Sequence, residues 1–337
     1  MKLLRKILLP FVPIYYVVVF LRNKFYDWSF LNTYSYNFPV ICVGNLSVGG
    51  TGKSPMVEYL VSLLKNKYQL AALSRGYGRD SKGFILADLH STSKVLGDEP
   101  FQLFNKFRDI IVAVDSDRQN GLALLKKIKP SIEVVLLDDA FQHRSVTAGL
   151  NILLTTFDQL YCNDCVLPAG NLREPKSGAK RAHAIVITKS PQSLSKDSKS
   201  RIINQLNTLP NQEVFFSSIQ YANVIISPTS TISIDELRGV RFTLVTGIAN
   251  PTPLITHLKS IGLYFDHLKF KDHHEFSNSE RELIYSKPIV LTTEKDYSRL
   301  ISETPNKVYY LPIRLEIDRS DAFQKLVESY VKKTLTN

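Results

Sequence analysis

The stretch that decides the fold is Gly44-Asn45-Leu46-Ser47-Val48-Gly49-Gly50-Thr51-Gly52-Lys53-Ser54. The apolar residues 38–46 predict a strand, and residues 54–67 place their leucines on one face of a helix. The stretch fits the pattern G-x-x-x-x-G-K-[ST], except that Ser47 stands at the first glycine position. A strand, a glycine-rich loop and a helix in this order indicate a phosphate-binding loop.

This loop predicts which residues bind a nucleoside triphosphate. Glycine lets backbone N–H groups close around phosphate oxygens, and a helix N-terminus adds a favourable dipole. Lys53 is expected to reach the terminal phosphates and to act in catalysis, while the Ser54 hydroxyl ligates Mg²⁺. The predicted nucleotide contacts are Ser47, Val48, Gly49, Gly50, Thr51, Gly52, Lys53 and Ser54.

Further strands surround this loop in the sequence. They are short, nearly continuous apolar runs, which is typical of parallel strands covered on both faces. Helical patterns such as residues 119–128 separate several of them, so the chain predicts an α/β fold with a P-loop NTPase-like, doubly wound parallel sheet. The predicted strands are Leu70–Leu73, Ile110–Val114, Glu133–Leu137, Asn151–Thr155 and Ala184–Thr188.

The chain of 337 residues suits two α/β lobes. After a polar stretch that follows residue 189, a second series of strands and helices begins near residue 242. Residues 214–221 alternate like an exposed or linking strand, and 308–317 are again strand-like. The predicted division is an apolar N-terminal segment at 1–30, a P-loop core at 31–213, a smaller α/β lobe at 214–317 with both linking strands, and a C-terminal helix at 318–337.

A pair of acidic residues follows one of the buried strands. Asp138 and Asp139 end the run Glu133–Leu137. P-loop proteins hold Mg²⁺ with a carboxylate at the end of a neighbouring strand. Adjacent carboxylates point to different sides, so one can reach the metal while the other holds water or substrate. We therefore predict a magnesium site formed by Ser54, Asp138 and Asp139.

The sequence favours ATP over GTP. P-loop GTPases generally recognise guanine with [NT]-K-x-D. Residues 188–191 (TKSP) lack the aspartate, and residues 293–296 (TEKD) carry an extra residue before the lysine. A purine contact at either segment stays open, and a regulatory GTPase or ATPase switch is the alternative to a kinase.

The N-terminus carries a short apolar stretch, residues 7–21 (ILLPFVPIYYVVVFL). A membrane-spanning helix needs about 20 apolar residues, and Pro10 and Pro13 interrupt this one. Basic residues flank it, and aromatic residues lie within and beyond it, as in segments that lie in a membrane interface. We expect a membrane-interface helix, with a helix packed on the core as the alternative. The flanking bases are Lys2, Arg5, Lys6, Arg22 and Lys24.

The net charge of +11 favours polyanionic partners such as lipid surfaces or phosphorylated substrates. A nucleic-acid-binding ATPase would need basic residues interleaved with aromatic platforms, and the basic residues here are scattered, so no nucleic-acid partner is expected. The three cysteines cannot form a disulfide framework, which indicates a reduced, cytosolic compartment.

Two further clusters carry charged side chains at element boundaries. Asp98 in Gly97-Asp98-Glu99-Pro100 opens a predicted helix, and its carboxylate has a plain structural role available as a helix cap. The segment 271–276 (KDHHEF) gathers acids and two imidazoles after a strand, where acid–base work or phosphate contact is a better expectation than a metal site.

Taken together, the motifs resemble the tetraacyldisaccharide 4′-kinase family of lipid A biosynthesis. The resemblance covers nearly the whole chain, and the family tolerates a residue other than glycine at the position of Ser47. It implies transfer of the ATP γ-phosphoryl group to the 4′-hydroxyl of a tetraacyldisaccharide 1-phosphate, giving lipid IVA, with Mg²⁺. The motifs in chain order are GNLSVGGTGKSP, LSRGYGR, GDEP, LLDDAFQHR, LPAGNLREP, VTGIANP, DHHEF and TEKD.

The resemblance also implies residue roles and a location. Asp98 matches the proposed catalytic base and His273 the histidine that assists it, with His274 as the alternative. The two would meet when the lobes close. The enzyme would act as a peripheral, monotopic monomer at the cytoplasmic face of the inner membrane. The implied substrate contacts are Arg75, Tyr77, Arg118, Gln142, His143 and Arg173.

Overall fold

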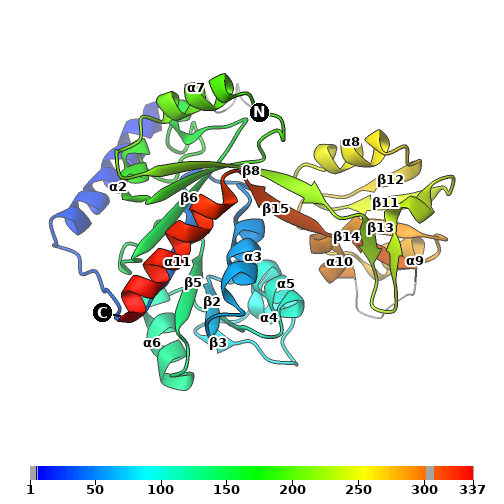
Figure 1. Ribbon diagram of the computed structural model, residues 1–337, viewed down its shortest axis with the longest axis horizontal. Helices are drawn as coiled ribbons and strands as arrows, with labels where there is room; N and C mark the ends of the chain where they lie inside the picture. Colours follow the sequence, from blue (N-terminus) through cyan, green and yellow to red (C-terminus); the bar gives the residue numbers. More distant parts are fainter. Residues whose placement is uncertain (1–4, 6, 301–306, 337) are drawn as a thin grey trace.

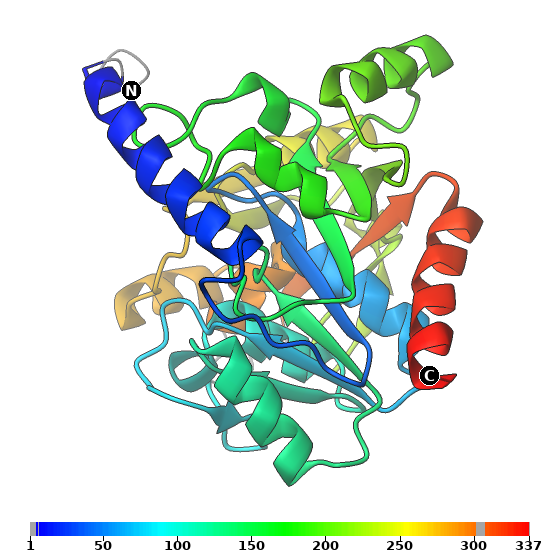
Figure 2. The ribbon, with the colours of Figure 1, turned by 90° about the vertical axis from the view of Figure 1, so that its left-hand side faces the viewer.

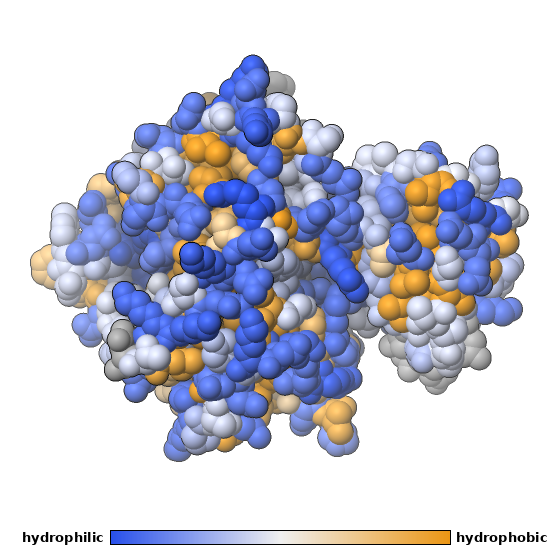
Figure 3. Space-filling model, in the orientation of Figure 1, coloured by the Kyte–Doolittle hydropathy of each residue, from blue (hydrophilic) through white to orange (hydrophobic). Residues whose placement is uncertain are grey.

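The computed structural model describes Arg5 and residues 7–300 and 307–336, and these residues form two lobes of unequal size (Figure 1). The larger lobe is built on a nine-stranded sheet and the smaller lobe on a six-stranded sheet. In the space-filling view the lobes meet at a narrow waist (Figure 3). The phosphate loop belongs to the larger lobe.

The sheet of the larger lobe has the order β15-β8-β7-β6-β1-β5-β2-β4-β3. The neighbours from β8 to β4 run parallel, while β15 and β3 pair antiparallel at the two edges. Every residue of β1 and β7 is buried, which confirms the predicted parallel strands covered on both faces. The strands are β1 (Val40–Asn45), β2 (Leu70–Ser74), β3 (Ile85–Leu86), β4 (Ile111–Val114), β5 (Val134–Asp138), β6 (Leu150–Thr156), β7 (Ala184–Thr188), β8 (Glu213–Tyr221) and β15 (Ile313–Ile317).

Helices cover both faces of this sheet, as the doubly wound prediction requires. On one face α3 (Lys53–Leu64), α5 (Asp98–Lys106) and α11 (Ser320–Thr336) bury apolar side chains against the strands. On the other face lie α6 (Arg118–Ile128) and α7 (Lys196–Leu206). Asp117 caps α6 by accepting hydrogen bonds from the backbone N–H groups of residues 119 and 120. Short helical segments at Ser93–Leu96 (α4), Tyr161–Asn163 and Lys176–Arg181 complete the lobe.

The smaller lobe has the strand order β10-β9-β14-β13-β11-β12, and its strands from β14 to β12 run parallel. Two apolar clusters form its core. Ser277 and Glu280 form a capping box at the start of α9, which explains why that helix begins at Asn278. The elements are β9 (Val224–Ile226), β10 (Thr231–Ser233), β11 (Phe242–Thr246), β12 (Phe265–Lys269), β13 (Val290–Thr293), β14 (Val308–Leu311), α8 (Thr252–Ser260), α9 (Asn278–Tyr285), α10 (Glu294–Leu300) and a short turn at Ile234–Leu237.

The chain crosses between the lobes twice, at residues 222–223 and at Pro312. Both β8 and β15 pair within the sheet of the larger lobe, so that sheet extends beyond the predicted boundary at residue 213. The sequence predicts an exposed or linking strand at residues 214–221. The strand does lead to the first crossing, but exposure is wrong for its first half, because Val214 to Ser218 are buried. The predicted strand 308–317 is two strands, one in each sheet, divided by Pro312.

The N-terminal helix α2 (Val12–Asp27) lies across the larger lobe, away from the smaller one (Figures 1 and 2). Tyr15 donates a hydrogen bond to the carbonyl of Arg173 at 2.8 Å, and Arg144 pairs with Asp27 at 2.7 Å. These contacts fix one side of the helix, while Ile14, Val17, Val18 and Leu21 stay exposed.

The described residues include no helix that is long and apolar enough to cross a membrane. Of the basic residues expected to flank the apolar stretch, Lys2 and Lys6 lie outside the described residues. Arg5, which is described, donates a hydrogen bond to the Asn171 side chain at 2.6 Å. The helix is therefore tied to the loop that follows residue 170 as well as to the residues near Arg144.

Candidate active site

The phosphate loop lies between β1 and α3, where the sequence predicts it. Gly49 and Gly52 adopt the positive φ angles of 107° and 85°, which glycine takes without strain. A Cβ atom added to Gly49 or Gly50 would meet no atom within 4 Å, so these two residues border open space. Lys53 and Ser54 form the first turn of α3. The loop thus directs a helix N-terminus toward a space that phosphate oxygens can fill.

Ser47 fits the first glycine position because its backbone does not need glycine's freedom. It is not among the residues with positive φ, and its carbonyl accepts a hydrogen bond from the Asn45 side chain at 2.6 Å. Two side chains at the end of β7 also hold the backbone of the phosphate loop in place. Thr188 donates to the carbonyl of Thr51 at 2.8 Å, and Lys189 donates to that of Gly50 at 2.6 Å. The side chains of the 188–191 segment therefore support the loop in this structure.

The two adjacent aspartates at the end of β5 have opposite electrostatic environments. Burial raises the pKa of Asp138 to about 6. Burial also opposes ionisation of Asp139, but the charges of Lys53 and Arg173 outweigh it and hold the pKa of Asp139 below its usual value. Lys53 Nζ lies 3.6 Å from Asp139, and Arg173 Nη1 lies 3.0 Å from it. The two carboxylates of the pair therefore have different protein partners, with Ser74 near Asp138 and the two cations near Asp139.

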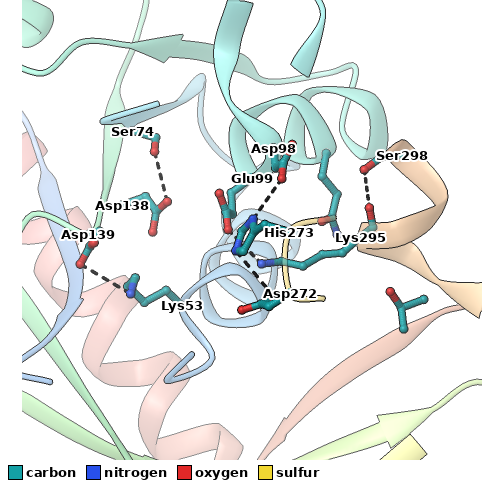
Figure 4. A network of polar contacts seen from close by, with 12 residues as sticks. Lys53, Ser74, Asp98, Glu99, Asp138, Asp139, Asp272, His273, Lys295 and Ser298 are labelled. Carbon is teal, nitrogen blue, oxygen red and sulfur yellow. Dashed lines mark hydrogen bonds and ion pairs between the residues drawn. The ribbon is translucent and has the colours of Figure 1, made fainter. Parts of the chain in front are cut away.

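Asp98 and His273 come together from the two lobes (Figure 4). Asp98 is the first residue of α5, and His273 lies in the loop after β12 with a φ of 57°. His273 Nδ1 and Asp98 Oδ2 are 3.2 Å apart. His274 instead contacts Glu280 at 3.0 Å, so the geometry favours His273 as the partner of Asp98.

The Asp98 carboxylate does not cap α5. Gly97 occupies the N-cap position of α5, and no side chain makes a capping hydrogen bond there. The Asp98 carboxylate instead forms an ion pair with Arg299 at 2.7 Å. Burial works against ionisation of Asp98, but the charge and hydrogen bond of Arg299 lower the pKa of Asp98. The carboxylate is therefore ionised at neutral pH, as a proton acceptor must be.

The predicted substrate contacts fall into two groups. Arg75 and Tyr77 are exposed, with Tyr77 79% accessible, and Arg173 and His143 are half-buried. Burial, and then the nearby charges beginning with Arg118, lower the pKa of His143 to about 4, so its imidazole is neutral at pH 7.

Arg118 and Gln142 form the second group, because they bind the protein's own backbone. Arg118 is 1% exposed and donates to the carbonyl of Asp115 at 2.7 Å and that of Asp138 at 3.4 Å. Gln142 donates to the carbonyl of Asn45 at 2.7 Å. In this structure the two side chains brace the ends of β5 and β1 and are not directed toward open space.

The sequence reasoning missed Arg299 and the other charged residues of α10. In the sequence, TEKD is a variant of a guanine motif and one motif of the family resemblance, and neither indicates a role for Arg299. In the structure Asp296 of that segment is fully buried and accepts hydrogen bonds from the Gly247 backbone and the Thr293 hydroxyl, both at 2.8 Å. The signal available in the sequence was the density of charge in residues 294–299, which an isolated surface helix would also show.

Phosphoryl transfer needs a phosphate cradle on one side of the reacting groups and a proton acceptor on the other. The larger lobe supplies the cradle, and the contact of Asp98 with His273 supplies an ionised carboxylate beside it (Figure 4). A regulatory switch has no need of such a pair. The fold and the site therefore define a P-loop kinase.

Comparison with known proteins identifies the particular family. A family model described as Tetraacyldisaccharide-1-P 4'-kinase matches residues 4–332, and the chain belongs to this family. It is 46% identical to the tetraacyldisaccharide 4'-kinase of Flavobacterium johnsoniae, covering 99% of each chain. It is 43% identical to that of Bacteroides thetaiotaomicron, covering 99% of this chain and 95% of the relative.

A solved structure agrees with this assignment. The crystal structure of LpxK from Aquifex aeolicus in complex with ATP matches with a TM-score of 0.78 and 31% identity, covering 97% of this chain and 99% of that one. The family favours the kinase over the regulatory GTPase or ATPase switch, which the loop alone also allowed.

Proposed function

We propose that this protein transfers the γ-phosphoryl group of ATP to the 4′-hydroxyl of a tetraacyldisaccharide 1-phosphate, giving lipid IVA. The observation that carries the proposal is the approach of His273 to Asp98 at 3.2 Å across the two lobes, in a chain of the tetraacyldisaccharide-1-P 4'-kinase family. The relatives' names state the acceptor, and the Aquifex aeolicus protein was crystallised in complex with ATP.

The residues of the phosphate loop and the first turn of α3 suit the phosphates of ATP. They border the open space beside Gly49 and Gly50, where a nucleotide's phosphate groups would lie. The Lys53 side chain is 18% exposed and lies close to Asp139, from where its charge can offset that of a terminal phosphate. Arg173, which shares Asp139 with Lys53, adds a second positive charge on the same side.

The residues beside the loop also fit Mg²⁺. Asp138 Oδ1 is buried, and among the described residues it has no hydrogen-bond partner, although Ser74 approaches Oδ2 at 3.3 Å. An unpartnered, buried carboxylate oxygen is costly unless a cation balances it. Ser54 and Asp138, with Asp139 beside them, would hold the ion. When bound, Mg²⁺ supplies positive charge that offsets the charge of the transferring phosphoryl group.

Asp98 is proposed to remove the proton from the acceptor hydroxyl. A sugar hydroxyl is a weak nucleophile at neutral pH, and a carboxylate within hydrogen-bond reach increases its reactivity. Arg299 and His273 approach Oδ2 of Asp98, which leaves Oδ1 to accept the proton. His273 lies beside the carboxylate on the smaller lobe, and Arg299 of that lobe contacts both groups.

The exposed basic residues near the loop suit the phosphate already present on the acceptor. Arg75 is exposed after β2, and its charge is close enough to act on His143. Tyr77 projects into solvent from the same segment, where its ring can pack against a sugar or an acyl chain. Arg118 and Gln142 would act indirectly, by holding the strand ends that carry the acidic pair and the loop.

Helix α2 is proposed to bind a membrane surface, at the cytoplasmic face of the inner membrane where an acylated acceptor would be found. Its outer side chains Ile14, Val17 and Val18 are 63%, 50% and 61% exposed, and Trp28 and Phe30 follow at 58% and 75%. An apolar face of this kind with aromatic residues at its end is typical of a helix that lies in the interface.

The test is a transfer assay with Mg·ATP and tetraacyldisaccharide 1-phosphate in detergent. The wild-type protein should form a product phosphorylated at the 4′ position. Asp98→Asn should lower kcat by about 10²- to 10⁴-fold, the usual effect of losing a general base. Asp235→Asn, which removes an exposed carboxylate paired with Arg238, is the matched control and should retain activity. A wild-type protein that binds ATP but forms no product would refute the proposed acceptor.

A further inference from the structure

Helix α10 of the smaller lobe packs against α5 of the larger lobe through charges of opposite sign. Lys295 pairs with Glu99 at 2.9 Å, and Glu294 pairs with Lys106 at 2.8 Å. Lys106 also pairs with Glu58 of α3 at 2.7 Å. These ion pairs hold together two helices that belong to different lobes.

Arg299 makes a third contact between these helices, and it differs from the other two. Its side chain is only 6% exposed. Its guanidinium group lies 2.7 Å from Asp98 Oδ2 through Nη2, and Nε donates to the same oxygen at 2.8 Å. The same Nη2 lies 2.9 Å from His273 Nδ1. One guanidinium group therefore touches both members of the Asp98–His273 pair.

The remaining nitrogen of Arg299 binds its own lobe. Nη1 contacts the buried carboxylate of Asp296 at 3.3 Å and the carbonyl of Gly247 at 3.4 Å. The backbone N–H of His273 donates to that same carbonyl at 3.1 Å. Arg299 and the backbone of His273 thus share the carbonyl of Gly247, in the loop after β11, which fixes their relative position.

Hydrogen-bond chemistry decides how the protons are arranged. A guanidinium group only donates and an ionised carboxylate only accepts, so Nδ1 can form a hydrogen bond with only one of them. Its contact with Arg299, at 2.9 Å, is shorter than that with Asp98, at 3.2 Å, which assigns Nδ1 as the acceptor of the bond from Arg299. Nδ1 then carries no proton for Asp98, and the ring proton lies on Nε2, which is 4.0 Å from Asp272 Oδ1. Two acceptors, Nδ1 and Asp98 Oδ2, therefore lie 3.2 Å apart, and the positive charge of Arg299 beside both offsets their repulsion.

We propose that Arg299 is a positioning residue that fixes the Asp98 carboxylate and the Nε2–H form of His273 together, and so couples the docking of α10 on α5 to the assembly of the acid–base pair. This inference rests on the proposed function, because it assigns Asp98 and His273 to the phosphoryl transfer. The ion pair of Lys295 with Glu99 belongs to the same interface but touches neither residue of the pair, so it serves as the internal comparison.

The first experiment compares Arg299→Gln with Lys295→Gln in the full-length protein. We expect Arg299→Gln to lower kcat by about 10²-fold, since misplacing a catalytic group by about 1 Å has an effect of that order. The KM for ATP should change by less than about twofold, because Arg299 has no contact with the phosphate loop. Lys295→Gln should lower kcat by less than about threefold, as expected for a partly exposed ion pair. Equal losses in the two variants would overturn the proposal.

Two further measurements, chemical rescue and the pH dependence of activity, test whether Arg299 positions Asp98 and His273 or only holds the two lobes together. Millimolar guanidinium ion should restore part of the activity of Arg299→Ala and none of that of Asp98→Asn. Removing Arg299 removes the charge that lowers the pKa of Asp98, so the acidic limb of the kcat/KM profile should move to higher pH. Arg299→Ala keeps the other charged groups near the pair, which are Glu99 of α5, Asp272 of the loop after β12, and Lys295 and Asp296 of α10. An unmoved acidic limb contradicts the proposal.

A second measurement does not depend on activity. Nitrogen-15 NMR of the imidazole should report the Nε2–H tautomer for His273 in the wild-type protein and in Lys295→Gln. In Arg299→Gln the chemical shifts of the two ring nitrogens should change. A wild-type protein with this tautomer but no transfer to the disaccharide would overturn the proposed function and leave the Arg299 arrangement standing. A wild-type ring protonated at Nδ1 would overturn the arrangement itself.

Discussion

Ile14 and Val18 lie one turn apart on the exposed side of α2, and replacing both with alanine tests the proposed membrane contact. The two substitutions remove five apolar carbon atoms, whose full transfer from water to lipid contributes about 0.8 kcal/mol each, or about 4 kcal/mol. The side chains are 63% and 61% exposed, so about 2.5 kcal/mol of that is available to a membrane. This corresponds to about 60-fold weaker binding.

Co-sedimentation with phospholipid vesicles measures this effect directly. Alanine favours helix, and neither side chain is buried, so the substitutions should leave α2 folded. Leu283 and Val240 of the smaller lobe are 51% and 40% exposed, and changing both to alanine removes the same number of carbon atoms. This control should bind vesicles like the wild-type protein. An Ile14→Ala/Val18→Ala variant that binds as tightly as the control would refute the reasoning.

Two further predictions concern the stability of the larger lobe. Phe323 is fully buried, with its ring 5.1 Å from that of Phe215, so Phe323→Ala should lower the free energy of unfolding by about 3–5 kcal/mol in denaturant titrations, and a loss under about 1 kcal/mol would contradict its place in the core. Burial, followed by neighbouring positive charges, lowers the pKa of His143 to about 4, so the unfolded chain binds the proton more readily. Between about pH 6.5 and pH 4 the wild-type protein should therefore lose up to about 1.4 kcal/mol per pH unit on acidification, and His143→Gln should lose less in the same titration.

The sequence predicts those parts of the site that depend on local structure. The phosphate loop, the strand before it and the acidic pair after β5 are each defined by residues close together in the chain, and their backbone requirements appear as glycines or apolar runs. Ser47 looked like an exception to the loop pattern. The structure explains it, because only Gly49 and Gly52 of the loop take a positive φ.

The parts that depend on distant contacts could not be predicted in the same way. Asp98 at the start of a helix fits a cap, and its actual partners, His273 and Arg299, lie 175 and 201 positions away. No local pattern marks such a partner. The alternating pattern of β8 predicts an exposed or linking strand. Its burial could not be predicted, because β15 and Phe323, which cover it, come from the far end of the chain.

Arg118 illustrates a limit of arguing from residue type. An arginine near a phosphate site suggests a phosphate contact, yet the guanidinium group is buried and binds backbone carbonyls at the ends of two strands. A charged side chain can be buried in this way when carbonyl oxygens and nearby carboxylates offset the cost. Its neighbours decide which role it takes, and these are set by the packing of the sheet.

The path of the chain through the two sheets has a consequence for how the protein folds during synthesis. The smaller lobe is inserted between β8 and β15, so the ribosome completes it before β15 and α11 emerge. Until then the phosphate-loop lobe lacks the helix that buries Phe323, Val327 and Val331 against its sheet. The inserted lobe can fold first, while the lobe that began first exposes an apolar face to chaperones or to aggregation. The residues of the nucleotide site are thus synthesised early, but the lobe that contains them becomes stable only after β15 and α11 have been synthesised.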